Sequence, residues 1–226
     1  LIKRKYPIFL RLLSERLNCP TFYPKRYTTL LRKGVFIMYS EYKSLLRERL
    51  DDYRYNHSLC VADEAKRLAL KCGVDPEQAY LAGLLHDVTK NASREEHLQI
   101  FARFGIILND VEKNAQKLWH AISGAAFCEN ILNITDSEII DAIRYHTTAK
   151  ADMSPLCKLL YLADFTSADR DYPDVDVMRR LVDKSFDEAF IYALQYTIKD
   201  LCDQKRAVHL DTIAAYNGAV ITLEGK

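Results

Sequence analysis

The sequence DPEQAYLAGLLHDVTK, residues 75–90, carries the strongest structural signal in the chain. Asp75 is a typical helix N-cap, and the proline that follows it suits the first helical position. The residues from there to Leu85 are apolar on almost every side, whereas a helix at a protein surface has a single apolar face. We therefore predict a central, buried helix that ends at the adjacent pair His86-Asp87.

Amphipathic segments flank this helix in the sequence. Over residues 56–72, apolar or small side chains recur every three or four positions, and Gly73 is a natural helix stop. Capping residues or capping boxes start most of the other predicted helices. These helices span residues 40–50 (cap Ser40), 93–105 (box Ser93-Arg94-Glu95-Glu96, stop Gly105), 120–132, 135–146 (box Thr135-Asp136-Ser137-Glu138), 154–164 (start Ser154-Pro155), about 185–203, and a short segment after Asp211.

Glycine and proline are scarce, at 7 and 6 of 226 residues, and few helix breakers favour long helices. No alternating run is long enough to predict a strand. Residues 110–118 give no clear pattern, and residues 169–176 are predicted to form a polar loop. The sequence therefore predicts an all-α fold, a globular helical bundle.

The composition is that of an ordinary soluble globular protein, with 49% hydrophobic and 28% charged residues. No apolar run reaches the about 18 residues that a membrane span needs. The start of the chain lacks the apolar core and cleavage site of a secretory signal. The six cysteines form no Cys-x-x-Cys pair. We therefore predict a cytoplasmic protein with free thiols.

Charge is distributed unevenly along the chain. Residues 1–37 carry nine Lys or Arg and one acidic residue, a net charge of +8, whereas the remainder carries −7 and is not expected to bind nucleic acid. The regular amphipathic pattern begins after Met38, the first methionine. We interpret residues 38–226 as the domain and residues 1–37 as a basic extension that is not part of the native protein. The alternative is a basic tail that binds RNA or an acidic partner.

Histidines and acidic residues form a spaced series around the buried helix. His57 lies near the start of one predicted helix and His86 near the end of the next, and a short connection at Gly73 should make the two helices antiparallel, so that these ends meet. The series continues with Asp87, His120, His146 and Asp164. Neutral imidazoles with carboxylates suit iron, manganese, zinc or cobalt. The alternative for each histidine is a capped or solvated side chain, and for the His-Asp pair a buried ion pair.

These residues resemble the HD-domain superfamily of metal-dependent phosphohydrolases, whose signature is H…HD…D. The closer resemblance is to its bacterial YqeK-type branch, from about Met38 to the C-terminus. The HD pair alone is a loose motif, whereas the full series is specific. The matching segments are Arg54-Tyr55-Asn56-His57-Ser58, Leu84-Leu85-His86-Asp87-Val88-Thr89-Lys90, Leu118-Trp119-His120-Ala121, Ala142-Ile143-Arg144-Tyr145-His146-Thr147-Thr148, Tyr161-Leu162-Ala163-Asp164, Asp211-Thr212 and Tyr216-Asn217.

The resemblance implies symmetrical cleavage of diadenosine tetraphosphate into two ADP molecules at a centre of two metal ions. Iron is the expected metal, with manganese, cobalt or zinc as alternatives. Carried over by position, one ion would be held by His57, His86, Asp87 and Asp164. Asp87 would bridge to the second ion, held by His120 and His146. The chain departs from the branch after Asp164, where Phe165-Thr166-Ser167-Ala168-Asp169-Arg170 replaces a variant of Ile-Glu-Pro-Gly-Arg.

The two ions would activate a water molecule to attack an inner phosphorus. Asp87 and Lys90 are the expected catalytic residues, and Lys90 is also placed to neutralise charge that develops on phosphate. Thr147, Thr148 and Arg170 are further candidates for phosphate contacts. Their alternative role is ordinary surface polarity.

Two other functions compete with this interpretation. One is another HD phosphohydrolase, a nucleotidase or a hydrolase of a signalling nucleotide, because a fold does not settle a substrate. The other is a non-catalytic module that senses nucleotides or associates with RNA, for which residues 1–37 are the only support. The expected partner is a dinucleoside polyphosphate or another nucleotide, without a membrane, and a homodimer is compatible with the sequence.

Overall fold

The computed structural model describes residues 31–225 of the chain, with side chains from Tyr39 onward. All regular elements in this part of the chain are helices, which confirms the all-α prediction. None of them is both long and apolar enough to cross a bilayer. In chain order they are α3 (Leu31–Arg49), α4 (Asp52–Cys72), α5 (Pro76–Leu85), α6 (Arg94–Phe104), α7 (Asp110–Asn114), the 3-10 helix η1 (Gln116–Leu118), α8 (Trp119–Asn130), α9 (Ser137–Tyr145), α10 (Pro155–Thr166), α11 (Val175–Lys184), α12 (Phe186–Asp203) and α13 (Leu210–Glu224).

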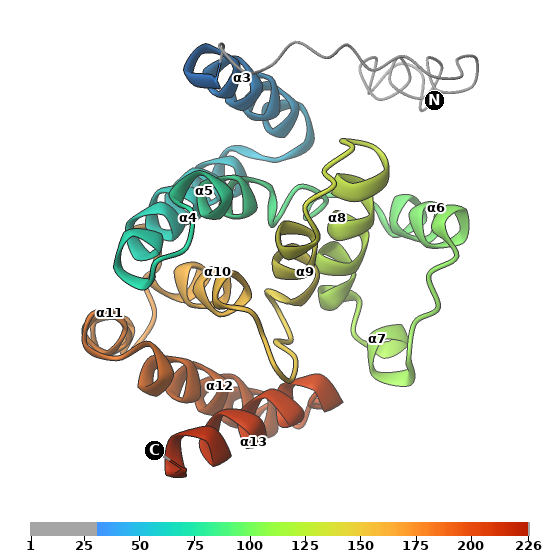
Figure 1. Cartoon of the computed structure of the whole chain (residues 1–226). Helices are drawn as coiled ribbons and strands as arrows, with labels where there is room; N and C mark the ends of the chain where they lie inside the picture. The colour runs from blue at the N-terminus through green and yellow to red at the C-terminus, as the bar shows by residue number, and fades with distance from the viewer. Residues whose placement is uncertain (1–30, 226) are drawn as a thin grey trace.

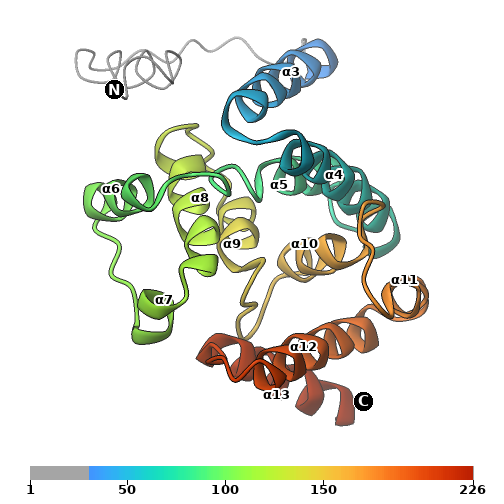
Figure 2. The ribbon, with the colours of Figure 1, turned by 180° about the vertical axis from the view of Figure 1, so that it is seen from behind.

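Helix α5 packs against α4, α9 and α10 (Figures 1 and 2). Helix α8 packs against α9, and helices α11, α12 and α13 lie at the end of the bundle opposite to α3. The side chains of Ala82, Leu84 and Leu85 have no exposed surface. The prediction of a central, buried helix is therefore confirmed. Trp119 packs with Phe101 in a smaller apolar cluster between α6 and α8.

The backbones of α4 and α5 approach each other closely at Gly83. A Cβ atom at this position would lie 2.8 Å from Ala62 Cα and 2.9 Å from the carbonyl oxygen of Val61. Backbone atoms cannot swing aside as a flexible side chain does, so glycine alone permits this approach. The contact sets the spacing between the helix that carries His57 and the helix that ends at His86.

Several sequence predictions are confirmed by the helix boundaries. Asp75 caps α5 ahead of Pro76, and its side chain accepts a backbone hydrogen bond. Gly73 and Gly105 follow α4 and α6 with φ angles of 71° and 65°, a left-handed conformation that glycine adopts readily. Ser154 caps α10. The five cysteines among the described residues are free thiols.

The predicted start of the first helix is wrong. Helix α3 begins at Leu31, and Ser40 lies inside it, where its carbonyl oxygen accepts a hydrogen bond from Ser44 Oγ at 2.9 Å. The serine side chain that bonds back to the preceding turn is that of Ser44, and such a bond is tolerated within a helix, so a serine in this segment does not by itself mark a helix start. Helix α3 crosses Met38 without interruption, and residues 1–30 of the predicted basic extension lie outside the described residues.

Neither of the two predicted capping boxes forms as predicted. Ser93 caps α6, but the Glu96 carboxylate pairs with Arg49 at 2.5 Å instead of closing a box. A charge-assisted bond to a buried guanidinium is stronger than a bond to a backbone amide. Helix α9 is capped by Asp136 and not by Thr135. The Asp136 carboxylate accepts bonds from two backbone amides, and a negative charge at a helix N-terminus is favourable.

The sequence pattern misses α7, η1 and α11. Helix α7 is only five residues long, too short for a periodic signal, although Asn109 and Glu112 form a capping box at its start. Helix α11 follows Asp174, which has a φ of 72° and makes no side-chain cap, so no start signal marks it. Two helices are longer than predicted, because α4 starts at Asp52 and α13 extends over 15 residues.

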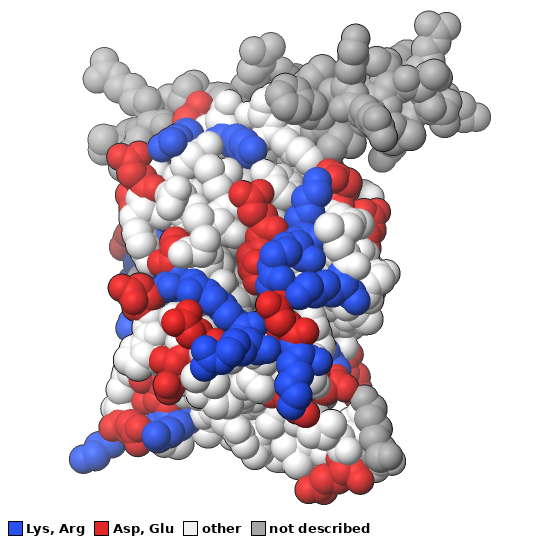
Figure 3. Space-filling model, turned by 90° about the vertical axis from the view of Figure 1, so that its left-hand side faces the viewer, with Lys and Arg blue, Asp and Glu red and all other residues white. Residues whose placement is uncertain are grey.

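Acidic and basic side chains alternate on the face of the molecule shown in Figure 3. Lys and Arg side chains gather across its middle, with Asp and Glu side chains between and around them. Ion pairs of this kind link α4 to α11, where Arg67 and Lys71 both contact Asp183, at 2.9 and 2.6 Å. This face is therefore not the continuous basic surface that follows a nucleic-acid backbone.

Candidate metal centre

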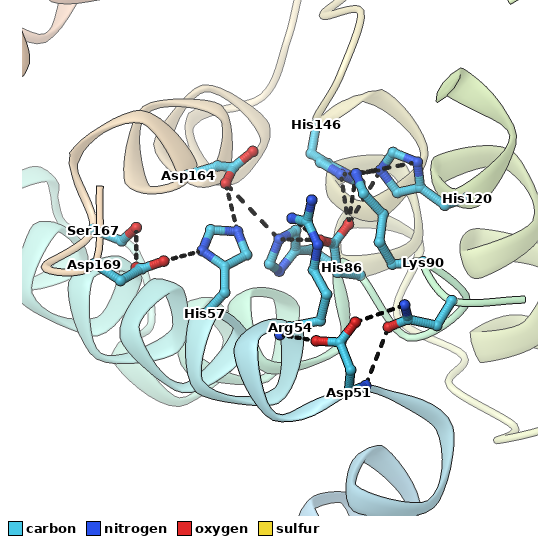
Figure 4. Close-up of polar contacts among 12 residues, drawn as sticks. Asp51, Arg54, His57, His86, Lys90, His120, His146, Asp164, Ser167 and Asp169 are labelled. Atoms are coloured by element: carbon cyan, nitrogen blue, oxygen red, sulfur yellow. Dashed lines mark hydrogen bonds and ion pairs between the residues drawn. The ribbon is translucent and has the colours of Figure 1, made fainter. Parts of the chain in front are cut away.

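The six predicted metal ligands converge on one place in the bundle (Figure 4). Five of them are buried, and the Asp164 side chain is 18% exposed. The antiparallel packing of α4 and α5 brings His57 and His86 together, with ring centroids 5.2 Å apart. The six side chains come from α4 (His57), the turn after α5 (His86 and Asp87), α8 (His120), the C-terminal end of α9 (His146) and α10 (Asp164).

The first part of the cluster surrounds Asp164. Its Oδ1 lies 3.0 Å from His57 Nε2 and 3.9 Å from His86 Nε2. The same His86 nitrogen lies 3.7 Å from Asp87 Oδ2. Two imidazole nitrogens and two carboxylates thus face a common space.

The second part of the cluster surrounds the other oxygen of Asp87. Asp87 Oδ1 lies 3.1 Å from His120 Nε2 and 3.6 Å from His146 Nε2. The two imidazole nitrogens face each other at 3.1 Å. Asp87 therefore belongs to both parts and directs one oxygen toward each.

The donor set fits a bound cation. Ligand atoms lie within 4.8 Å of one another in three overlapping groups, and His86, Asp87 and His146 each belong to two of these groups. His86 Nε2 and Asp87 Oδ1 are buried and have no hydrogen-bond partner. An unpaired buried polar atom costs about 1–3 kcal/mol. A metal ion among these atoms would satisfy both.

Hydrogen bonds behind the cluster fix the tautomers of three histidines. His86 Nδ1 lies 2.7 Å from the Gly83 carbonyl oxygen, and His146 Nδ1 lies 2.7 Å from that of Ile143. A carbonyl oxygen can only accept, so each Nδ1 carries the proton and each Nε2 presents a lone pair to the cluster. His57 Nδ1 donates in the same way to Asp169 Oδ2 at 2.7 Å. Metal-binding histidines usually have such acceptors.

Burial keeps two of the imidazoles neutral. It lowers the pKa of His86 to about 3 and that of His120 to about 4. His57 differs, because its bonds to Asp164 and Asp169 outweigh burial and raise its pKa to about 9. A metal ion at His57 Nε2 must therefore displace a proton. Burial favours neutral carboxyls, but interactions with the neighbouring imidazoles hold the pKa of Asp87 well below its usual range, and Arg170 together with His57 does the same for Asp164.

Asp169 is a site residue that the sequence interpretation misses. Besides contacting His57, it accepts a hydrogen bond from Ser167 Oγ at 2.8 Å through Oδ1. Both residues lie in the loop after α10, where the chain departs from the YqeK-type pattern. That departure marks the loop as unusual, but it does not show that the loop returns to α4, because Asp169 and His57 are 112 positions apart.

Lys90 lies against the cluster and is not a solvated cation at a helix end. Its Nζ is 3.0 Å from His120 Nε2 and 3.5 Å from Asp87 Oδ1, and its side chain is 27% exposed. Burial lowers the pKa of Lys90. The ammonium group therefore stands at the border between the ligand cluster and solvent.

Two guanidinium groups complete the positive rim of the cluster. Arg170 Nη2 contacts Asp164 Oδ1, and its Nε donates to the Asp164 carbonyl oxygen at 2.6 Å. Arg54 Nη1 lies 3.4 Å from Asp87 Oδ2. Their side chains are 28% and 26% exposed. Arg54 is a second residue that the sequence interpretation misses, although its position one helical turn before His57 is a usable signal.

The remaining candidates divide between contact and structural roles. The residue Thr147 is partly exposed, but its Oγ1 atom is buried and has no hydrogen-bond partner. Thr148 is buried and donates its hydroxyl proton to the Ala149 carbonyl oxygen. The histidines excluded from the series, His97 and His209, bond elsewhere, the first to Ser123 Oγ and the second as the cap of α13. Trp119 packs in the interior.

Comparison with known proteins places this cluster in a family. The model of the HD domain matches residues 54–169, an interval that includes all six residues of the cluster. The symmetrical bis(5'-nucleosyl)-tetraphosphatase of Bacillus subtilis is 34% identical to the chain over 175 residues, which cover 77% of this chain and 94% of the relative. The enzyme of the same name from Staphylococcus aureus is 33% identical over 177 residues, covering 77% and 91%.

The fold has a close counterpart among solved structures. A crystal structure from Clostridium acetobutylicum, described as a predicted HD superfamily hydrolase involved in NAD metabolism, superposes with a TM-score of 0.79. It is 33% identical in sequence, and the match covers 81% of this chain and 97% of the other. The chain is therefore a member of the HD-domain family of metal-dependent hydrolases.

Proposed function

We propose that the chain hydrolyses diadenosine tetraphosphate symmetrically, producing two ADP molecules. The observation that carries the proposal is the cluster in which Asp87 directs one oxygen to each of two groups of imidazole nitrogens. The relatives of 33–34% identity that bear the name symmetrical bis(5'-nucleosyl)-tetraphosphatase support the substrate.

The two groups are proposed to hold two metal ions. His57, His86, Asp87 and Asp164 form the first set of ligands, and Asp87, His120 and His146 form the second. Iron is the proposed metal, and manganese, cobalt and zinc are compatible with the same donors. Bound ions supply Lewis acidity to the phosphate and activate water as the nucleophile.

Side chains of the rim are proposed to receive the polyphosphate. Lys90, Arg54 and Arg170 present three positive charges around two carboxylates, and each is about a quarter exposed. Lysine serves as a point charge, whereas arginine binds phosphate oxygens in pairs. Lys90 and Arg54 both contact Asp87, so a phosphate held by them lies beside the shared carboxylate. The hydroxyl of Thr147, which is buried and has no hydrogen-bond partner, is a further candidate donor, whereas the hydroxyl of Thr148 is already bonded.

The products of a nucleotide panel test the substrate. Iron-loaded protein is expected to convert diadenosine tetraphosphate into ADP alone, measured by anion-exchange chromatography. The matched substrates are diadenosine triphosphate, a nucleoside monophosphate, a cyclic signalling nucleotide and NAD. AMP with ATP as products would contradict the proposed symmetry. Faster hydrolysis of another panel member would favour the alternative HD phosphohydrolase.

Removal of the Asp169 carboxylate is expected to weaken metal binding. Asp169→Ala deprives His57 Nδ1 of its acceptor, and loss of a partner behind a ligating histidine typically costs about 10- to 100-fold in metal affinity or activity. Isothermal titration calorimetry with Mn²⁺ measures the metal affinity of the variant and of the wild type. Asp171→Ala, an exposed acid in the same loop, is the control and should bind like the wild type. Equal affinities for both variants would refute the role of Asp169.

A further inference from the structure

Tyr53 is an aromatic side chain beside the cluster that takes no part in the proposed ligand set. It lies in the first turn of α4 and is 58% exposed. Among the large apolar side chains exposed in the described part of the chain, Tyr53 is the only aromatic one. A ring that is more than half exposed is accessible to a ligand.

The Tyr53 ring is held by its neighbours on two sides. It lies parallel to the His57 ring, at an interplanar angle of 6° and a centroid distance of 6.5 Å. The Arg54 guanidinium carbon lies 5.3 Å from the Tyr53 ring centroid. Arg54 also contacts Asp87. The ring therefore lies beside the ligand cluster and one rim cation, while more than half of its surface remains open to solvent.

We propose that Tyr53 stacks against a nucleobase of the substrate and so makes the site select nucleotides over inorganic polyphosphates. This inference rests on the proposed function, in which the rim cations receive the phosphates. A base joined to those phosphates through one ribose can reach a ring that is next to Arg54. Stacking is tolerant of base identity, because every base has a π face, so selection for nucleotides does not require selection for adenine.

The alternative role is a structural one, in which Tyr53 orients Arg54 or the start of α4. The two roles predict different losses of binding affinity when Tyr53 is replaced. A stacking platform contributes to the binding of ligands with a base and contributes nothing to ligands without one. A residue that positions Arg54 affects both, because Arg54 is proposed to contact phosphate.

Binding of ADP and of inorganic pyrophosphate to the Mn²⁺-loaded full chain distinguishes these roles. Calorimetry compares the wild type with Tyr53→Ala and Tyr53→Phe. Tyr53→Ala is expected to weaken ADP binding by about 5- to 150-fold, the range that one base stack provides. Pyrophosphate binding should change less than twofold, and Tyr53→Phe should retain the affinity for ADP. Leu70→Ala, which changes an exposed residue of the same helix, is the control.

Three outcomes overturn the proposal: a wild type that prefers ADP no more than pyrophosphate, an unchanged affinity of Tyr53→Ala for ADP, or equal losses for both ligands. Because Tyr53 is exposed, we expect the Tyr53→Ala variant to fold, and circular dichroism tests this. Failure of the wild type to produce two ADP molecules from diadenosine tetraphosphate would refute the proposed function instead. The binding comparison would still decide whether Tyr53 recognises a base.

Discussion

Asp87→Asn is expected to abolish hydrolysis of diadenosine tetraphosphate and to reduce the amount of bound metal. Asp87 Oδ1 faces His120 and His146, while Oδ2 faces His86. Asparagine has nearly the same shape, but it is neutral and presents an NH₂ donor in place of one acceptor oxygen. The donor would face imidazole lone pairs or a metal ion. Loss of a residue that hydrogen-bonds to a metal ligand lowers metal affinity or activity about 10- to 100-fold. Loss of the shared ligand itself should therefore lower the rate of hydrolysis more than 100-fold.

Metal content per chain and initial rate are the measurements for Asp87→Asn. Protein purified without chelator is analysed by plasma mass spectrometry, and ADP release is followed at saturating substrate. Asp63→Asn makes the same chemical change at an exposed position of α4 and should behave like the wild type. A variant that keeps both its metal and its activity would refute the shared role of Asp87. If the wild type bound diadenosine tetraphosphate without hydrolysing it, the result would favour the alternative of a non-catalytic module that senses nucleotides.

The convergence of His57 and His86 could be predicted because it follows from local rules. A turn at Gly73 makes two helices antiparallel, and residues near the start of one then lie beside residues near the end of the next. The hydrogen bonds of His86 and His146 are also local, because each Nδ1 bonds to the carbonyl oxygen three residues earlier. Both bonds depend on where a helix ends, and sequence patterns locate helix ends only approximately.

The role of Asp169 could not be predicted, because it depends on the path of a loop. Nothing in residues 167–174 has a helical or alternating period. The end of α10 and the loop after it contact α4 through side chains distant in sequence, Thr166 Oγ1 with Glu64 and Asp169 with His57. The orientation of Arg54 and Tyr53 is a similar case. A helical period places them near His57 but does not decide between solvent and the cluster.

The close approach of α4 and α5 connects the fold to the proposed metal centre. Gly83 has two roles, because its missing side chain permits the approach and its carbonyl oxygen accepts the bond from His86 Nδ1. Glycine inside a helix is costly by about 0.5–1 kcal/mol relative to alanine. A sequence chosen only for helix stability would therefore not contain glycine here. Its presence in the middle of a buried apolar helix is explained by the contact with Ala62.

Gly83→Ala is consequently expected to destabilise the protein, although alanine is the better helix former. The added Cβ would lie within 3.0 Å of three backbone atoms of α4, so the helices must separate. Overpacking of a core costs about 1–3 kcal/mol, and more where backbone has to move, while the gain in helix propensity is at most about 1 kcal/mol. We expect a net loss of about 2 kcal/mol in the free energy of unfolding, measured by urea denaturation. Separation of α4 from α5 should also reduce the metal content, because His57 and His86 lie on opposite sides of the contact.

Gly218→Ala provides the matched control. Gly218 lies inside α13, and a Cβ atom there would meet no atom within 4 Å. The same substitution should therefore stabilise the protein by about 0.5–1 kcal/mol through helix propensity alone. If both variants were stabilised, the contact at Gly83 would be looser than its geometry indicates, and the spacing of His57 from His86 would need another cause. Opposite signs for one chemical change would show that the glycine in α5 is retained for the packing that assembles the ligand cluster.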